Sequence, residues 1–124
     1  MLRALIVEDN PLFRKAFRTI LHERLPSIVI EEAGSGEEAL QKIDGAPPDL
    51  IFTDMRLAGM NGLELAKKMK KDFPGIRIAM LTGYDFPEYR RAASQHGMDR
   101  FFVKDSLDCK EIKEFVQCIP ESNR

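Results

Sequence analysis

Short apolar runs alternate with longer amphipathic stretches along the chain. Five runs of three or four apolar residues have the length of short β-strands, at 4–7, 28–30, 50–52, 78–81 and 101–103. The first, third and fourth are continuously apolar, which is typical of parallel strands covered on both faces. The pattern therefore predicts five strands of a parallel sheet.

Between these runs the apolar period lengthens to about 3.6 residues, which predicts amphipathic helices. The stripes are Leu12, Phe13, Ala16, Phe17, Ile20 and Leu21; Leu65, Ala66, Met69 and Phe73; Phe86, Tyr89, Ala93 and His96; and Ile112, Phe115, Val116 and Ile119. Ser35-Gly36-Glu37-Glu38 has the pattern of a capping box that begins a further short helix. Five strand–helix units in order predict an α/β fold, a three-layer doubly wound (βα)5 domain. Its five-stranded parallel sheet is expected in the order 2-1-3-4-5.

Composition fits one globular domain, predicted to span 1–119, with 120–124 as a flexible tail or the start of a linker. The 124 residues are 44% hydrophobic and 31% charged, with a net charge of −1. That balance gives no electrostatic reason for this segment to bind nucleic acid or a membrane surface. No apolar run approaches the roughly 18–20 residues that span a bilayer, and the first residues do not form a signal peptide. We therefore expect a cytoplasmic protein without membrane contact.

Two cysteines and two histidines limit the other chemistry of the chain. Cys109 and Cys118 lie in one predicted helix, about 13 Å apart on opposite faces, which is beyond disulfide reach. No Cys/His spacing resembles a zinc site.

Polar residues follow four of the five predicted strands. Glu8 and Asp9 follow the first strand, Asp54 the third, Thr82 the fourth and Lys104 the fifth. Parallel doubly wound sheets bind ligands at the carboxyl ends of their strands, so we expect these side chains to converge. Three neighbouring carboxylates are unfavourable without a cation, and hard oxygen ligands favour Mg²⁺, with Mn²⁺ as an alternative ion.

A carboxylate beside Mg²⁺ can act as a nucleophile toward phosphorus and form an aspartyl phosphate. Asp54 is the preferred nucleophile because it ends the central strand. Glu8 and Asp9 then become metal ligands, Lys104 stabilises charge on the phosphoryl oxygens, and Thr82 donates a hydrogen bond to one of them.

Three other functions compete with this one. Gly34-Ser35-Gly36-Glu37-Glu38-Ala39 fits the dinucleotide pattern G-x-G-x-x-A, but Glu37 and Glu38 place negative charge where a pyrophosphate would sit. A phosphatase with an aspartyl nucleophile needs a second acid two residues later, where this chain has Arg56. A non-phosphorylated interaction module of the same fold would not need Asp54, Thr82 and Lys104 together.

The motifs Val7-Glu8-Asp9-Asn10, Asp54 with Gly62 eight residues on, Thr82-Gly83 and Phe102-Val103-Lys104 resemble the receiver domain of two-component response regulators. The resemblance covers residues 2 to about 119. It implies that Asp54 accepts a phosphoryl group from a sensor histidine kinase or phosphotransfer protein in a Mg²⁺-dependent reaction. Such a domain is a signalling switch and catalyses only its own phosphorylation and dephosphorylation.

The same resemblance implies a role for individual positions. Glu8, Asp9, Asp54 and the main-chain carbonyl of Arg56 would hold the metal. Thr82 and Phe101 would form the switch pair, Lys104 would bind phosphate, and the Arg56 and Tyr84 side chains would tune the phosphate lifetime.

The resemblance also implies an output. The face built from the fourth helix, fifth strand and fifth helix would change on phosphorylation, offer a homodimer surface, and control an output domain or partner in transcription regulation. The Glu8-Asp9 and Lys104-Asp105 pairs are more usual in receivers of NarL/LuxR-like regulators. Three positions depart from the common pattern: Ala58 and Asp105 replace prolines, leaving the Lys104–Asp105 peptide isomer open, and Phe101 replaces tyrosine.

Overall fold

The computed structural model describes residues 2–44 and 46–118. Its elements are β1 (Arg3–Val7), α1 (Pro11–Arg24), β2 (Val29–Ala33), α2 (Gly36–Ile43), β3 (Leu50–Asp54), α3 (Gly62–Asp72), β4 (Arg77–Thr82), α4 (Pro87–Gln95), β5 (Arg100–Val103), the 3₁₀ helix η1 (Lys104–Ser106) and α5 (Cys109–Gln117). All strand pairs are parallel, and the sheet order is β2-β1-β3-β4-β5. The predicted fold class is confirmed. The tail at 120–124 and Ile119 lie outside the described residues.

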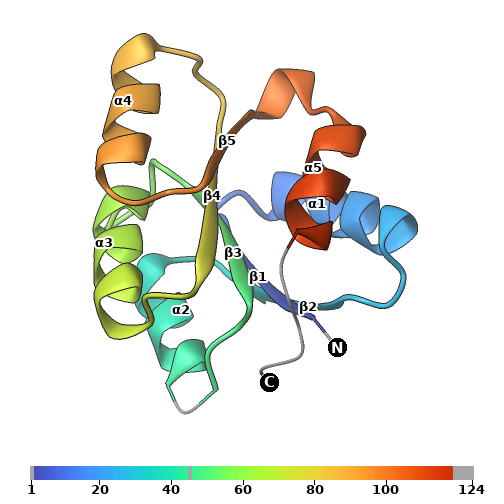
Figure 1. Cartoon of the computed structure of the whole chain (residues 1–124), viewed down its shortest axis with the longest axis horizontal. Helices are drawn as coiled ribbons and strands as arrows, with labels where there is room; N and C mark the ends of the chain where they lie inside the picture. Colours follow the sequence, from blue (N-terminus) through green and yellow to red (C-terminus); the bar gives the residue numbers. More distant parts are fainter. Residues whose placement is uncertain (1, 45, 119–124) are drawn as a thin grey trace.

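Helices cover both faces of the sheet. In Figure 1, α1 and α5 lie on one side, and α2, α3 and α4 lie on the other. Alternate residues of β1 enter two separate cores: Leu5 and Val7 pack on the α2–α3–α4 side, and Ala4 and Ile6 pack on the α1–α5 side. Because a strand directs successive side chains to opposite faces, a continuously apolar strand is what this three-layer arrangement requires.

The edge strand β2 differs from its predicted position. It begins one residue later than 28 and continues through Glu31 and Glu32. Each of these acids lies against an arginine: Glu31 pairs with Arg3 at 2.7 Å, and Glu32 pairs with Arg14 at 3.0 Å. An edge strand is partly open to solvent and can carry charged side chains, so the end of the apolar run did not mark the end of the strand.

Two of the predicted apolar stripes are narrower than expected. Leu12 is 81% exposed, because it lies about 140° around the helix from the buried Phe17. In the α4 region only Ala93 is fully buried, while Phe86 precedes the helix as its N-cap and is 44% exposed. The predicted stripes therefore included Leu12, on the outer face of α1, and Phe86, which precedes α4.

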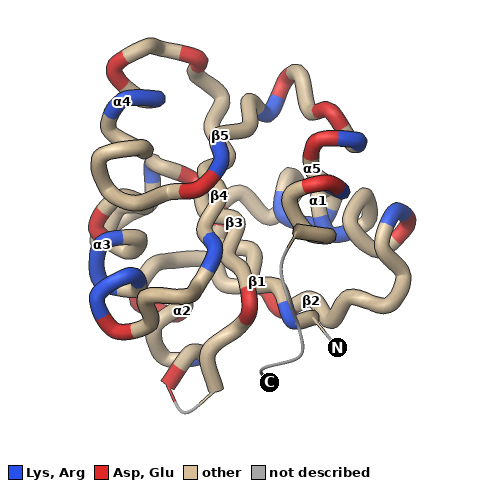
Figure 2. Tube along the Cα trace, in the orientation of Figure 1, with Lys and Arg blue, Asp and Glu red and all other residues tan. Residues whose placement is uncertain are grey.

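Other features concern the cysteines, one peptide bond and the surface charge. Cys109 and Cys118 are free, as predicted. The Lys104–Asp105 peptide bond is trans. No helix of the described residues is long and apolar enough to cross a membrane. Figure 2 shows acidic and basic residues intermixed on the outer helices α1, α3 and α5.

Candidate functional site

The sheet brings the predicted site residues to one edge. β1, β3 and β4 are neighbours, with Val7 opposite Thr53 and Asp54 opposite Leu81. Carboxylate oxygens of Glu8, Asp9 and Asp54 all lie within 4.8 Å of one another. Residues separated by more than 40 positions in the sequence therefore form one acidic cluster at the carboxyl ends of the strands.

The three acids differ in exposure. Glu8 is 1% exposed and Asp54 8%, whereas Asp9 is exposed. Burial raises the pKa of the Glu8 carboxyl above its ordinary value, although hydrogen bonds from Lys104 and from the Asn10 amide act in the opposite direction. A cation bound between these acids would offset the cost of keeping them charged.

Lys104 is the cation nearest to this cluster. Its ammonium lies 2.9 Å from Asp54 Oδ2 and also pairs with Glu8. Burial disfavours the charged lysine, but its hydrogen bonds to Glu8 and Asp54 outweigh this effect and raise the pKa of Lys104. The ammonium also lies 4.6 Å from the centre of the Phe13 ring, a cation–π distance. Lys104 is therefore charged and already in contact with the predicted nucleophile.

Thr82 is buried at the end of β4, and its hydroxyl is hydrogen-bonded to Tyr84 and not to Asp54. Its hydroxyl oxygen accepts a hydrogen bond from the Tyr84 amide at 3.2 Å. The other predicted switch residue, Phe101, is half-buried under the Arg90 guanidinium, which lies 4.5 Å from its ring centre.

The Arg56 and Tyr84 side chains contact each other beside the site. The Arg56 guanidinium lies 4.7 Å above the Tyr84 ring and donates a hydrogen bond to the Tyr89 hydroxyl at 2.9 Å. The Arg56 amide donates to Asp54 Oδ1 at 3.2 Å, so its backbone adjoins the acceptor. Sequence spacing does not indicate that Tyr89 is a partner of Arg56, because 33 residues separate them and only the packing of α4 brings them together.

Close contact with the backbone of Asp54 explains why position 62 is a glycine. A Cβ at position 62 would lie 2.1 Å from the Asp54 carbonyl oxygen. The Gly62 amide also donates to the Met55 carbonyl at 3.0 Å. The loop after β3 therefore folds back onto the acceptor strand, and any larger residue at position 62 would displace it.

The donor set fits a magnesium ion. Its oxygens are hard ligands, two of the three carboxylates are buried, and one lysine does not neutralise three acids. Glu8, Asp9 and Asp54 could hold the ion, and the Arg56 backbone lies beside them.

Comparison with known proteins identifies the family. The family model described as response regulator receiver domain matches residues 4–117. The chain belongs to this family. It is therefore a receiver domain of the response regulators of two-component systems, a signalling switch.

Relatives of this receiver domain include a response regulator and a transcriptional regulatory protein. The response regulator protein VraR of Staphylococcus saprophyticus is 33% identical over 118 residues, covering 94% of this chain and 55% of VraR. The transcriptional regulatory protein YesN of Bacillus subtilis is 29% identical over 125 residues, covering 100% of this chain and 34% of YesN. The chain thus spans between about a third and about half of the length of these relatives.

Solved receiver structures have the same fold. The response regulator TrrA of Thermotoga maritima, in complex with Mg²⁺-BeF, is 35% identical with a TM-score of 0.82, over 95% of this chain and 98% of TrrA. The signal receiver domain of the regulator NarL from Mycobacterium tuberculosis is 30% identical with a TM-score of 0.83, over 94% of each chain.

The glycine loop after β2 binds a side chain of its own helix. The Gly34 amide donates to Glu38 Oε1 at 2.8 Å, and Ser35 accepts from the Glu38 amide at 3.0 Å. The predicted capping box is thus only half formed, since the Glu38 carboxylate binds Gly34 and not the Ser35 amide. The Glu38 carboxylate therefore already occupies the backbone site that the pyrophosphate of a dinucleotide would need. The glycine pattern of this loop does not indicate a dinucleotide site.

Glu38 is expected to make stability depend on pH. The Gly34 hydrogen bond, followed by the charges of Lys42 and Arg14, lowers the pKa of Glu38 below 4.5. The pKa of Glu38 is therefore lower in the folded chain than in the unfolded chain. The Glu38 carboxylate stabilises the fold above about pH 4.5, and this stabilisation is lost as the pH falls through the folded pKa. Glu38→Gln should therefore be less stable than the parent at pH 7, by under about 1 kcal/mol for this exposed group, and equally stable near pH 3. Urea unfolding at both pH values tests this, with Glu23→Gln as control. A difference that persists at low pH would contradict it.

Proposed function

We propose that this receiver domain is a phosphorylation-dependent switch. Asp54 accepts a phosphoryl group from a sensor histidine kinase or phosphotransfer protein with Mg²⁺, or Mn²⁺, and the domain then controls an output domain or partner. The observation that carries this proposal is the position of Asp54, which adjoins two further carboxylates and the Lys104 ammonium at 2.9 Å. The magnesium-bound TrrA structure, at 35% identity, supports it by analogy.

The two oxygens of Asp54 have different partners. Oδ1 accepts from the Arg56 amide at 3.2 Å, and Oδ2 accepts from Lys104 at 2.9 Å. In phosphoryl transfer one of these oxygens forms the new bond to phosphorus, and the phosphorus–nitrogen bond of the donor phosphohistidine breaks, leaving the imidazole with the electron pair. Bound Mg²⁺ would neutralise charge on the phosphoryl oxygens. Glu8, Asp9 and Asp54, with the Arg56 carbonyl, would hold the ion.

Lys104 and Thr82 would then exchange partners. A phosphoryl group on Asp54 offers Lys104 new oxygens, and an ion bound by Glu8 replaces the lysine as its positive partner. The Thr82 hydroxyl hydrogen is free to donate to a phosphoryl oxygen, because its present hydrogen bond uses only the oxygen as acceptor. Movement of Thr82 would open space for Phe101 to turn inward from beneath Arg90.

That rearrangement would reach the face formed by α4, β5 and α5. A switch of this kind needs only a few kcal/mol between its two states. We infer that this face contacts the output domain or partner, including a second copy of the chain in a phosphorylated homodimer. The response regulator VraR and the transcriptional regulatory protein YesN are roughly two and three times as long as this segment. We propose that the segment acts through such an output in transcription regulation and does not itself bind nucleic acid.

Amide NMR with Mg²⁺ and beryllofluoride tests the proposed function. Beryllofluoride mimics the phosphoryl group, so amides of α4, β5 and α5 should shift in addition to those next to Asp54. Mg²⁺ alone is the matched control and should move mainly the residues of the acidic cluster. Unchanged α4, β5 and α5 resonances in the beryllofluoride complex would contradict this output face.

A further inference from the structure

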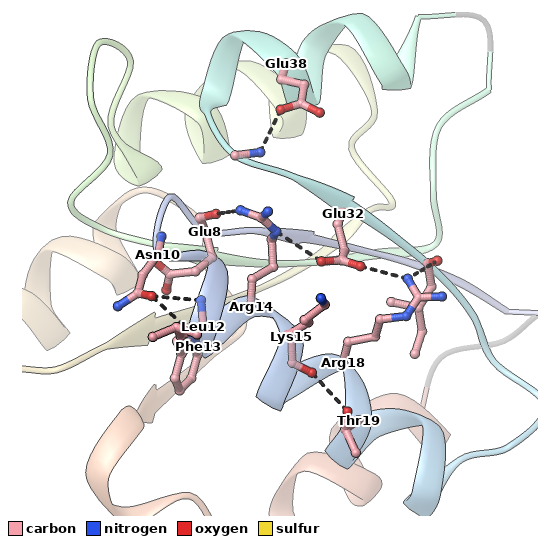
Figure 3. A network of polar contacts seen from close by, with 12 residues as sticks. Glu8, Asn10, Leu12, Phe13, Arg14, Lys15, Arg18, Thr19, Glu32 and Glu38 are labelled. Atoms are coloured by element: carbon pink, nitrogen blue, oxygen red, sulfur yellow. Dashed lines mark hydrogen bonds and ion pairs between the residues drawn. The ribbon is translucent and has the colours of Figure 1, made fainter.

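Arg14 joins the loop after β1 to the end of β2. Its Nη1 donates to the Glu8 carbonyl oxygen at 2.7 Å, and its Nε donates to the Glu32 carboxylate at 3.0 Å (Figure 3). The Arg14 side chain is only 24% exposed. Its amide donates to the Asn10 carbonyl at 3.0 Å, so its backbone belongs to the first turn of α1. The guanidinium is therefore fixed both by its helix and by β2.

Glu8 is held at three of its polar groups. Its amide donates to the Ala33 carbonyl of β2 at 3.0 Å, and its side chain accepts from the Asn10 amide at 3.0 Å. The Arg14 guanidinium binds the remaining main-chain group, the Glu8 carbonyl. The Glu8 carboxylate also pairs with Lys104, so Arg14 is the side chain that binds the Glu8 main chain, whereas Lys104 binds its carboxylate.

The Glu8 carbonyl determines where Asp9 lies. A peptide unit is planar, so fixing the Glu8 C=O direction also fixes the Asp9 amide and the Asp9 Cα. Asp9 is exposed, and its side chain has no hydrogen bond or ion pair with another residue in 2–44 and 46–118. Its carboxylate can therefore be directed at the acidic cluster only through its backbone.

We propose that Arg14 is a positioning residue for the metal site. Through the Glu8 carbonyl it orients the Glu8–Asp9 peptide, so that both carboxylates face Asp54 before an ion arrives. The proposal rests on the proposed function, because it concerns Mg²⁺ affinity. Side chains that orient metal ligands without touching the metal commonly contribute about 10–100-fold to metal affinity.

The charge of Arg14, taken alone, predicts the opposite change in Mg²⁺ affinity, so the two effects can be told apart by experiment. Arg14 is a positive charge near a cation site, so its removal should strengthen Mg²⁺ binding if charge alone mattered. A loss of affinity on removing this charge can only come from lost orientation. Arg14→Lys separates the two effects, since lysine keeps the charge but lacks the planar fork that reaches Glu8 and Glu32 together.

Arg18 supplies a matched control. It pairs with the other oxygen of Glu32 at 3.0 Å, and its Nη1 also donates to the Ile30 carbonyl at 3.3 Å. It thus shares the carboxylate partner of Arg14 but contacts β2 instead of Glu8, as Figure 3 shows. Arg18→Gln removes the same charge and a bond to the same glutamate.

Mg²⁺ dissociation constants, measured by amide NMR titration at constant ionic strength, test the proposal on the whole chain. We expect Arg14→Lys and Arg14→Gln to raise the Kd about tenfold, while Arg18→Gln stays within about twofold of the parent. The melting temperature without Mg²⁺ shows whether each variant is folded. If the Arg14 variants do not fold, Glu32→Gln, which retains Arg14 but removes its charged partner, should raise the Kd to a smaller extent.

Three results would overturn the inference. The first is a Mg²⁺ Kd of Arg14→Lys equal to that of the parent, and the second is tighter Mg²⁺ binding by Arg14→Gln. The third, where the Arg14 variants do not fold, is an unchanged Mg²⁺ Kd for Glu32→Gln. Failure of the proposed function has a different signature: the unsubstituted chain itself would bind no Mg²⁺, which would remove the basis for the inference as well.

Discussion

Replacing Asp54 with asparagine is expected to abolish labelling of the chain by acetyl phosphate and Mg²⁺. An amide oxygen is a far weaker nucleophile than a carboxylate, so no acyl phosphate should form. The fold should survive, because asparagine has the same shape and its one side-chain oxygen can still accept from either the Arg56 amide or Lys104, which are 3.2 Å and 2.9 Å from different Asp54 oxygens in the parent. Intact-mass spectrometry should therefore show a phospho-adduct for the parent and none for Asp54→Asn.

The control for this experiment is an acid outside the site. Asp72→Asn changes an exposed residue at the end of α3 and should be labelled like the parent. Circular dichroism should confirm that both variants are folded. A phospho-adduct of normal yield in Asp54→Asn would contradict the assignment of the acceptor.

The fold was predictable because its strands are short, apolar and regularly spaced. Continuous apolar runs at β1, β3 and β4 indicated a sheet covered on both faces, and the positions just after the strands indicated the site. Asp54 and Lys104 are 50 residues apart in the sequence, but they lie at the carboxyl ends of strands in one sheet. The Lys104 ammonium therefore donates a hydrogen bond to Asp54 at 2.9 Å. Strand order and strand ends thus carried most of the information about which residues meet.

Contacts between side chains of different elements were not predictable in this way. The pairing of Arg56 with Tyr89 depends on how α4 packs beside the loop after β3, and the bond from Arg14 to the Glu8 carbonyl depends on one rotamer. Leu12 fitted an apolar period but lies on the outer face of α1. Periodicity identifies which residues share a face, whereas the packing of the other elements decides how much of that face is buried.

The structure sharpens the prediction for the lifetime of the phosphorylated state. Hydrolysis needs a water molecule in line with the bond between Asp54 and phosphorus. We propose that Arg56 and Tyr84 flank this approach. The Arg56 guanidinium lies 4.7 Å from the centre of the Tyr84 ring and donates a hydrogen bond to the Tyr89 hydroxyl at 2.9 Å. The Tyr84 ring also stacks on Phe86, with ring centres 5.6 Å apart. The pair is thus supported by neighbours, and a guanidinium near phosphoryl oxygens can add charge-assisted hydrogen bonds to them.

The Arg56→Ala, Tyr84→Ala double variant is therefore expected to lose its phosphoryl group about tenfold faster than the parent, which corresponds to about 1.4 kcal/mol of barrier. Decay is measured by intact mass after the phosphodonor is removed. Tyr89→Phe is the matched control: it removes only the hydroxyl that binds Arg56 and leaves the stack on Tyr84, so its decay should stay much closer to that of the parent. Equal rates for the double variant and the parent would show that neither side chain shields the acyl phosphate from water.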